Sequence, residues 1–172
     1  VPVHIELFNK FGFELPKYAH LGLIMIVDSN GVKRKISKRK DTDFTVESYH
    51  RRGYPAVALQ EYLMTIANTN FEAWRIGHPD APLDEFEFSF SKVGSSPLFD
   101  TAKLINISKN CISKMTAIDL YKNLTEWAEK YDAEFYKLLV NNKDYAILVL
   151  NIERGKKKPR KDFANYGDVK RL

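Results

Sequence analysis

The residues best suited to chemistry in this sequence form one basic run, residues 33–40, which reads Lys-Arg-Lys-Ile-Ser-Lys-Arg-Lys. Lysine ammonium groups act as point charges on phosphate oxygens, and an arginine guanidinium can bind two oxygens at once. Ser37 adds a hydroxyl that can donate to an oxygen, and Ile36 adds an apolar side chain that can anchor the loop. The run therefore suits a polyphosphate, although its composition is also typical of a solvated charge cluster or a nonspecific nucleic-acid patch.

An apolar run directly before these cations predicts the element that positions them. Residues 21–27 read Leu-Gly-Leu-Ile-Met-Ile-Val, and residues 28–31 read Asp-Ser-Asn-Gly. Continuous hydrophobicity over this length indicates a strand covered on both faces, and the polar residues indicate a tight turn. We therefore expect a buried strand, a turn and then a mobile basic loop. Asp41 and Asp43 follow the loop, where they can cap a helix or hold the loop's lysines when no nucleotide is bound.

The rest of the chain is predicted to be mainly helical. The clearest helix covers residues 55–68, because a proline stands in its first turn and apolar residues recur at i, i+3, i+4, i+7 and i+8. Thr116 and Asp132 are suitable N-caps for two more helices. Residues 86–90 alternate aromatic and polar side chains and are predicted to be extended. Further helices are predicted at residues 3–11, 45–52, 71–76, 100–106, 108–115, 117–131, 133–141 and 145–154.

Composition limits the class of protein. The 172 residues are 44% hydrophobic with a net charge of +5, which suits one sizeable domain and favours a polyanionic partner. Cys111 is the single cysteine, so no intramolecular disulfide can form, which fits a reducing cytoplasm. Separately, we expect the protein to be a monomer. We predict that Cys111 is a small buried residue on a helix rather than a nucleophile. The apolar run is too short to cross a membrane, and no metal ligands are predicted. The start at Val1, already in a helical pattern, suggests a piece of a longer protein.

The order of residues within the basic run carries a family resemblance. Residues 35–39, Lys-Ile-Ser-Lys-Arg, resemble the KMSKS signature of class I aminoacyl-tRNA synthetases, in the K-[IL]-S-K-R form typical of glutamyl-tRNA synthetases. Residues 16–21 resemble the P-x-[YF]-x-H-L approach to that motif. Residues 53–63 resemble the G-Y-x-P-x-A-x-x-x-Y-L region after it, with one residue fewer before the proline. Residues 96–104 resemble the family's S-x-A-x-F-D-x-x-K-L segment, so the resemblance extends from about His4 to about Asp168.

This resemblance implies a fold and a division into domains. The fold class would be mainly α, with a helical stem-contact bundle beside a short remnant, one or two strands, of a Rossmann-type α/β catalytic domain. Residues 1–44 would end the catalytic domain, residues 45–155 would form the stem-contact domain, and residues 156–172 would be a basic linker toward an anticodon-binding domain. The HIGH motif and the glutamate-binding half are not in this sequence, so we expect the chain to be inactive alone.

The resemblance also implies a reaction and its residues. The parent enzyme would attach L-glutamate to tRNA(Glu) through a glutamyl-adenylate, using ATP with Mg²⁺. Lys35 and Lys38 would be catalytic, because they would neutralise the charge on the departing pyrophosphate. Together with Ser37 and Arg39 they would form the ATP-binding loop, which must close and reopen. The predicted tRNA contacts are Lys103, Lys109, Arg154 and Lys158.

Two alternative functions remain open at this point. A glutaminyl-tRNA synthetase also carries a KMSKS-type loop, although the helical continuation after Gly53 fits the glutamyl form better. A non-catalytic tRNA- or RNA-binding module can reuse the same fold. Whether the parent enzyme also charges tRNA(Gln) stays open. One departure from the family pattern is Gly22, which stands where the family commonly has proline and is expected to loosen the start of the strand.

Overall fold

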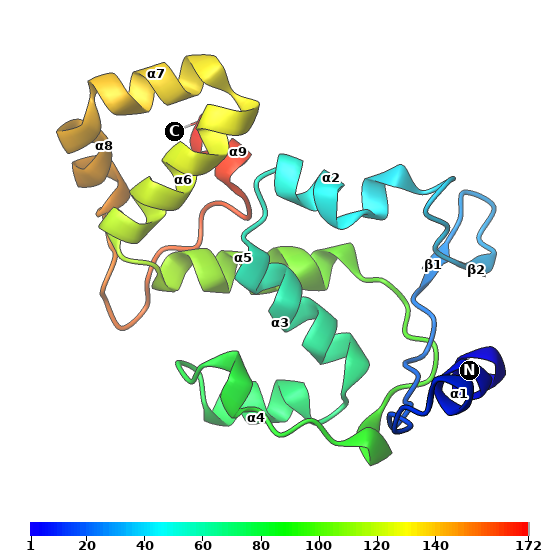
Figure 1. The fold of residues 1–172 in the computed structure, drawn as a ribbon. Helices are drawn as coiled ribbons and strands as arrows, with labels where there is room; N and C mark the ends of the chain where they lie inside the picture. Colours follow the sequence, from blue (N-terminus) through cyan, green and yellow to red (C-terminus); the bar gives the residue numbers. More distant parts are fainter. Residues whose placement is uncertain (172) are drawn as a thin grey trace.

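The computed structural model describes residues 1–171, and α-helices make up most of this part of the chain (Figure 1). The two strands are β1 (Met25–Val27) and β2 (Lys33–Lys35), and short 3-10 turns cover Thr42–Phe44, Leu83–Glu85 and Phe90–Lys92. The prediction of a mainly α fold with one or two strands is confirmed. The helices are α1 (Pro2–Phe11), α2 (Val46–Arg51), α3 (Ala56–Ala67), α4 (Phe71–Gly77), α5 (Thr101–Lys114), α6 (Ala117–Tyr131), α7 (Ala133–Asn141), α8 (Lys143–Leu150) and α9 (Tyr166–Val169).

Side-chain caps explain where several helices begin. The N-terminal amides of a helix have no partner within it, so a short polar side chain at the N-cap stabilises the first turn. Thr116 accepts a hydrogen bond from the amide of Asp119, and Asp132 accepts one from the amide of Phe135. Asp100 caps α5 in the same way. The two predicted caps, Thr116 and Asp132, are therefore confirmed, and the starts of α6 and α7 were readable from the sequence.

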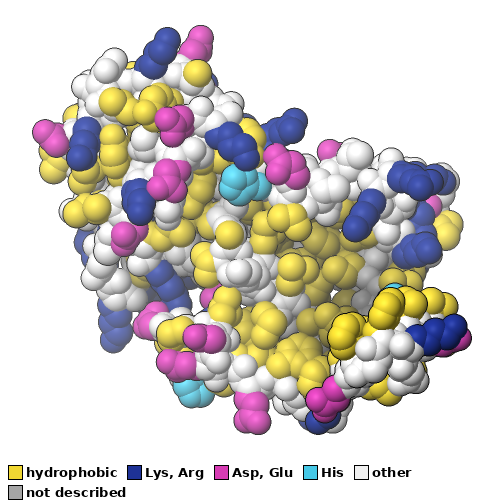
Figure 2. Space-filling view, in the orientation of Figure 1, with side chains coloured by type: hydrophobic (Ala, Val, Ile, Leu, Met, Phe, Trp, Pro, Cys, Tyr) yellow, Lys and Arg dark blue, Asp and Glu magenta, His cyan; other side chains and the backbone are white. Residues whose placement is uncertain are grey.

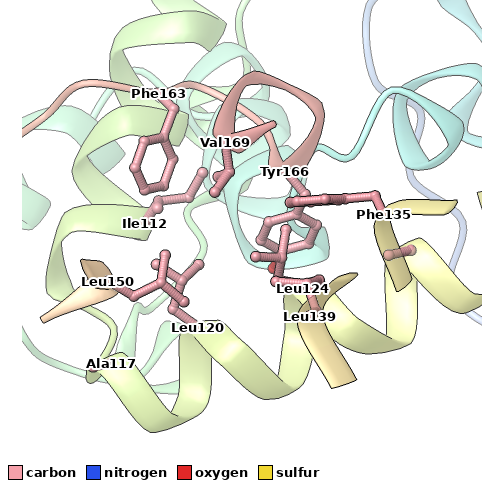
Figure 3. Close-up of a cluster of buried hydrophobic side chains, with 11 residues drawn as sticks. Ile112, Ala117, Leu120, Leu124, Phe135, Leu139, Leu150, Phe163, Tyr166 and Val169 are labelled. Atoms are coloured by element: carbon pink, nitrogen blue, oxygen red, sulfur yellow. The ribbon is translucent and has the colours of Figure 1, made fainter. Parts of the chain in front are cut away.

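Two hydrophobic clusters hold the helices together, and α5 contributes to both. The aromatic cluster contains Tyr49 of α2, Tyr54, Tyr62 of α3 and Leu104 of α5. The C-terminal cluster gathers α6 to α9 against the second half of α5 (Figure 3). Because one continuous helix reaches both clusters, it fixes their relative position. The buried members of the C-terminal cluster are Ile112, Ala117, Leu120, Leu124, Ala128, Phe135, Leu139, Leu150, Phe163, Tyr166 and Val169.

The continuity of α5 corrects one prediction. The sequence predicted two helices, 100–106 and 108–115, whereas α5 runs without a break from Thr101 to Lys114. Ser108 is fully buried inside this helix, and its hydroxyl donates to the carbonyl of Ala164. A serine at this position can end a helix by binding its own backbone. Here a distant carbonyl accepts its hydrogen bond, so the helix continues.

The strand prediction was also partly wrong. Only residues 25–27 of the apolar run form a strand, and β1 pairs with β2 in antiparallel register, with Ile26 opposite Arg34. Residues 33–35, predicted as the start of a loop, are the partner strand. Val27 is 49% exposed, so the strand is not covered on both faces. Ladder hydrogen bonds need a neighbouring strand, and the run has such neighbours only along its last residues.

The C-terminal residues combine an exposed basic segment and a packed one. The cations at 156–158 and 160–161 are exposed. Phe163, Tyr166 and Val169, in contrast, are buried in the C-terminal cluster. The helix predicted at 145–154 begins at Lys143 and ends at Leu150, because the chain turns back there to bring residues 163–169 onto α5 and α6. Aromatic residues just after a basic run are the sequence signal for this return.

Candidate phosphate-binding site

The candidate site begins with the turn between β1 and β2, which Asp28 shapes. One carboxylate oxygen of Asp28 accepts hydrogen bonds from the amides of Asn30, at 2.9 Å, and Val32, at 3.0 Å. The amide of Asp28 donates to the carbonyl of Val32 across the turn. Gly31 has a φ of +77°, a conformation that glycine adopts without steric cost. The sequence Asp28-Ser29-Asn30-Gly31 therefore favours this turn through its own local hydrogen bonds.

The hairpin is attached to the helices through the second edge of β1. The Met25 amide donates to the Pro97 carbonyl at 2.8 Å, and the Phe99 amide donates to the Met25 carbonyl at 2.7 Å. The Phe99 ring then packs against the rings of Tyr49 and Tyr62, with centroids 5.9 Å and 5.0 Å away. Segment 97–99 thus lies beside β1 as a short parallel neighbour. Through the Phe99 ring, this segment connects the hairpin to α2 and α3. Figure 1 shows the chain that precedes α5 running past β1.

After β2 the chain closes into the basic turn, which we define as residues 35–41. The amides of Lys40 and Asp41 donate to the Ser37 carbonyl at 3.1 Å and 2.8 Å. Ile36 is half-buried, and its amide donates to the Ile24 carbonyl at 3.1 Å. This bond ties the backbone of the segment to the chain before β1, while anchoring by the apolar Ile36 side chain stays a prediction. The turn has a defined backbone, and the bonded Ile36 amide lies immediately before Ser37.

Asp41 and Arg34 form the strongest polar contact of the site. Both terminal nitrogens of Arg34 donate to the two carboxylate oxygens of Asp41, each at 2.7 Å. The Ser37 amide donates to the same carboxylate, also at 2.7 Å. The bonds from Arg34 and then from the Ser37 amide lower the pKa of the Asp41 carboxyl to about 2. The sequence predicted that the acids after the loop would cap a helix or hold the lysines of the loop. Asp41 does neither with its carboxylate, which binds Arg34 instead.

The remaining cations of the run point to solvent. The side chains of Lys33, Lys35, Lys38, Arg39 and Lys40 are all exposed. Within the described residues, the ion pairs of this run are those of Arg34, with Asp41 and, at 3.8 Å, with Asp28. Figure 2 shows the resulting group of dark blue side chains over β1 and β2. Several uncompensated positive charges on a short, hydrogen-bonded turn make a site that attracts an anion with several oxygens.

Comparison with curated proteins identifies relatives along nearly the whole sequence. A glutamate–tRNA ligase of Clostridium beijerinckii is 46% identical over 171 residues, which is 99% of this chain and 31% of that protein. A glutamate–tRNA ligase of Acetivibrio thermocellus is 47% identical over 95% of the chain and 30% of its own length. The chain is homologous to glutamate–tRNA ligases. More distantly, the enzyme of Sorangium cellulosum is 33% identical over 99% of the chain.

The predicted resemblance to glutamyl-tRNA synthetases is therefore confirmed over nearly the whole chain. The chain spans about a third of the length of the curated ligases it matches. No protein-family model matches the sequence.

The four predicted tRNA contacts of this ligase homologue have different surroundings. Lys158 is exposed in the basic segment after α8, while Lys109 is half-buried on α5. Lys103, also on α5, forms an ion pair with Glu72 at 2.8 Å. Arg154 points inward and donates to the carbonyls of Ile112 and Met115, and burial lowers the pKa of its guanidinium. The four cations thus differ in burial and in partners, and their contact with tRNA stays a prediction.

The donors of the basic turn fit phosphate oxygens better than a metal ion. Lysine and arginine cannot ligate Mg²⁺, which prefers carboxylate and water oxygens. Asp41, the nearest carboxylate, already accepts three hydrogen bonds. Within residues 1–171 there is no group of three or more His, Cys, Asp or Glu side chains placed to hold a metal ion. In the same part of the chain, no helix combines the length and the hydrophobicity needed to cross a membrane.

Proposed function

We propose that this chain is the part of a glutamate–tRNA ligase that carries the ATP-pyrophosphate loop and the helices that contact tRNA. The observation that supports this most is the basic turn, where Lys35 and Lys38 are exposed on a backbone tied by Asp41. Residues 1–44 would end the catalytic domain, 45–155 would be the stem-contact domain, and the following residues would lead toward an anticodon-binding domain. The homology to glutamate–tRNA ligases supports this arrangement.

The proposed reaction has two steps. The carboxylate of L-glutamate attacks the α-phosphate of ATP and releases pyrophosphate, and the terminal ribose hydroxyl of tRNA(Glu) then takes the glutamyl group from the adenylate. Negative charge accumulates on pyrophosphate as its bond to the α-phosphate breaks. Lys35 and Lys38 would stabilise that charge, and Ser37 and Arg39 would contact the remaining phosphate oxygens. Mg²⁺ would be bound with ATP and would shield the phosphate charges.

The chain alone would not perform this reaction, because glutamate would be bound by a part of the ligase outside these residues. The test therefore uses the chain extended to its natural ends, with purified tRNA and with glutamate and glutamine compared as substrates. We expect glutamate to be attached, and we expect Lys38→Ala to lower the rate about a hundredfold, the scale of losing one transition-state charge contact. Lys122→Ala, which removes an exposed lysine of α6, is the matched control.

Each outcome decides a different part of the proposal. Glutamate transfer that is unaffected by Lys38→Ala would overturn the role of the basic turn and leave the ligase function standing. Transfer of glutamine alone would indicate a glutaminyl enzyme. Transfer of neither amino acid would overturn the ligase function and favour a non-catalytic RNA-binding module.

A further inference from the structure

Asp41 is more completely bonded than its place at the edge of an exposed turn requires. Its side chain is only 8% exposed, while Arg34 beside it is 36% exposed. Its two oxygens accept three hydrogen bonds, two from Arg34 and one from the Ser37 amide, all of 2.7 Å. A planar guanidinium that meets a carboxylate through two parallel bonds defines the orientation of both groups. The contact therefore joins β2 to the far end of the basic turn.

The simplest alternative explanation is that Asp41 caps the next helix. Asp41 does stand at the N-cap of the 3-10 turn Thr42–Phe44, but its carboxylate makes no capping hydrogen bond there. The carboxylate reaches backward to Arg34 and Ser37 instead. Asp43, two residues further on, is exposed and takes no part in the contact. The bonds of Asp41 thus serve the basic turn and not the helix after it.

We propose that Asp41 is a positioning residue for ATP, which acts by holding the basic turn in the shape that presents Lys35 and Lys38. Lys35 ends β2 next to Arg34, and Lys38 follows Ser37, so each lysine adjoins a residue that Asp41 binds directly. The inference deepens the proposed ligase function and rests on it. The ion pair also leaves the lysines free, because it satisfies the Asp41 carboxylate with a guanidinium that is not in the Lys-Ile-Ser-Lys-Arg motif.

The expected defect follows from population arithmetic. Without Asp41 the basic turn adopts several conformations, and only the one that presents Lys35 and Lys38 to ATP, which we call competent, can bind it. The apparent dissociation constant rises by the inverse of the competent fraction, so a turn that is competent a tenth of the time raises the KM for ATP about tenfold. The KM for glutamate should not change, because in the proposed function glutamate would be bound by a part of the ligase outside these residues. Partial unfolding would instead lower kcat and leave both KM values unaltered.

The kinetic experiment measures ATP–pyrophosphate exchange by the complete ligase, with glutamate and tRNA present. We expect Asp41→Ala and Asp41→Asn to raise the KM for ATP about tenfold at an unchanged KM for glutamate. Asp41→Glu keeps the carboxylate and should raise the KM for ATP less than Asp41→Ala does. Asp43→Ala is the matched control and should leave this KM unchanged. Arg34→Ala combined with Asp41→Ala should be no worse than Asp41→Ala alone, because both changes break the same contact.

A second measurement tests the contact without activity. The groups that face the Asp41 carboxylate are Arg34, the Ser37 amide and Lys40, and Asp28 lies beyond Arg34. The NMR titration midpoint of this carboxyl should lie near 2, and Arg34→Ala should move it toward the ordinary value of 3.8. An ordinary midpoint in the unaltered ligase would overturn the inference, even if the Asp41 variants failed to fold.

The failures of the two proposals can be told apart. An active ligase whose KM for ATP is the same in all Asp41 variants would overturn the role of Asp41 and leave the ligase function intact. A ligase without exchange activity, with Asp41 unaltered, would overturn the proposed function and this inference with it.

Discussion

Gly53 gives the sharpest stability prediction, because it lies at a contact between the end of α2 and the start of α9. It follows α2 with a φ of +85°, and its carbonyl accepts a hydrogen bond of 2.9 Å from the Tyr166 amide of α9. A Cβ added at Gly53 would lie 2.8 Å from the Tyr166 nitrogen and 2.9 Å from the Tyr166 Cβ. An alanine at this position would therefore have to adopt a left-handed backbone conformation. Its methyl group would also push the backbone at residue 53 away from the backbone at Tyr166.

The two effects of Gly53→Ala have separate magnitudes. The left-handed conformation costs a residue with a Cβ about 1–2 kcal/mol. Overpacking of a tight contact typically costs a further ~1–3 kcal/mol. For a chain of this size each kcal/mol lowers the melting temperature by about 2–4 °C, so a loss of 3 kcal/mol corresponds to about 6–12 °C. The assays are urea unfolding of residues 1–172, which gives the free energy of unfolding, and thermal unfolding, which gives the melting temperature, both monitored by circular dichroism.

Gly155→Ala is the matched control for this measurement. Gly155 also has a positive φ, +70°, but a Cβ there would meet no atom within 4 Å. It should therefore show only the conformational cost of about 1–2 kcal/mol. Equal losses of unfolding free energy in the two variants would refute the reasoning, because they would show that the contact between Gly53 and Tyr166 is not tight.

Two further predictions concern the interior. Leu124→Ala removes a fully buried side chain of the C-terminal cluster and should lower the free energy of unfolding by about 2–5 kcal/mol in the same urea assay. Leu148→Ala, at a position that is 69% exposed, should change it by less than about 0.5 kcal/mol. Burial, and then the charge of Glu61, raise the pKa of the Cys111 thiol to about 12, so at pH 8 it should stay protonated. Mass spectrometry should find Cys111 unmodified by iodoacetamide in the folded protein and fully modified in urea, and rapid labelling without urea would contradict this.

The sequence predicted the features that depend on local signals. The caps at Thr116 and Asp132, the hairpin turn after β1 and most helices follow from neighbouring residues, and so they could be found without a structure. Features that depend on distant partners could not be predicted in this way. Leu63 fits the apolar stripe of α3 but is 42% exposed, because periodicity shows which residues share a face and not how wide a surface covers that face.

The candidate site shows the same division. Its cations and their motif are local and were predicted, together with Ile36 as an anchor. The contact between Arg34 and Asp41 was not, because the two residues are seven apart and meet only after the chain has turned. Arg154, whose predicted contact with tRNA stays a prediction, was not expected to donate to carbonyls at the end of α5, as the structure shows. Charge alone does not distinguish a cation that faces a ligand from one that satisfies the end of a helix.

Gly22, which stands where the family commonly has proline, lies in the segment that leads into β1 and the candidate site. Its replacement of the usual proline was expected to loosen the strand, but the chain at Gly22 lies directly against residues 94–96. A Cβ at Gly22 would come within 2.9 Å of the Gly94 carbonyl and closer still to the Ser96 amide, so a residue with a side chain would force the two segments apart. Their close approach leads into the hydrogen bonds of Met25 with Pro97 and Phe99. The absence of a side chain at Gly22 thus accommodates the close approach of residues 94–96, next to the segment that pairs with β1 and places the Phe99 ring against Tyr62 of α3.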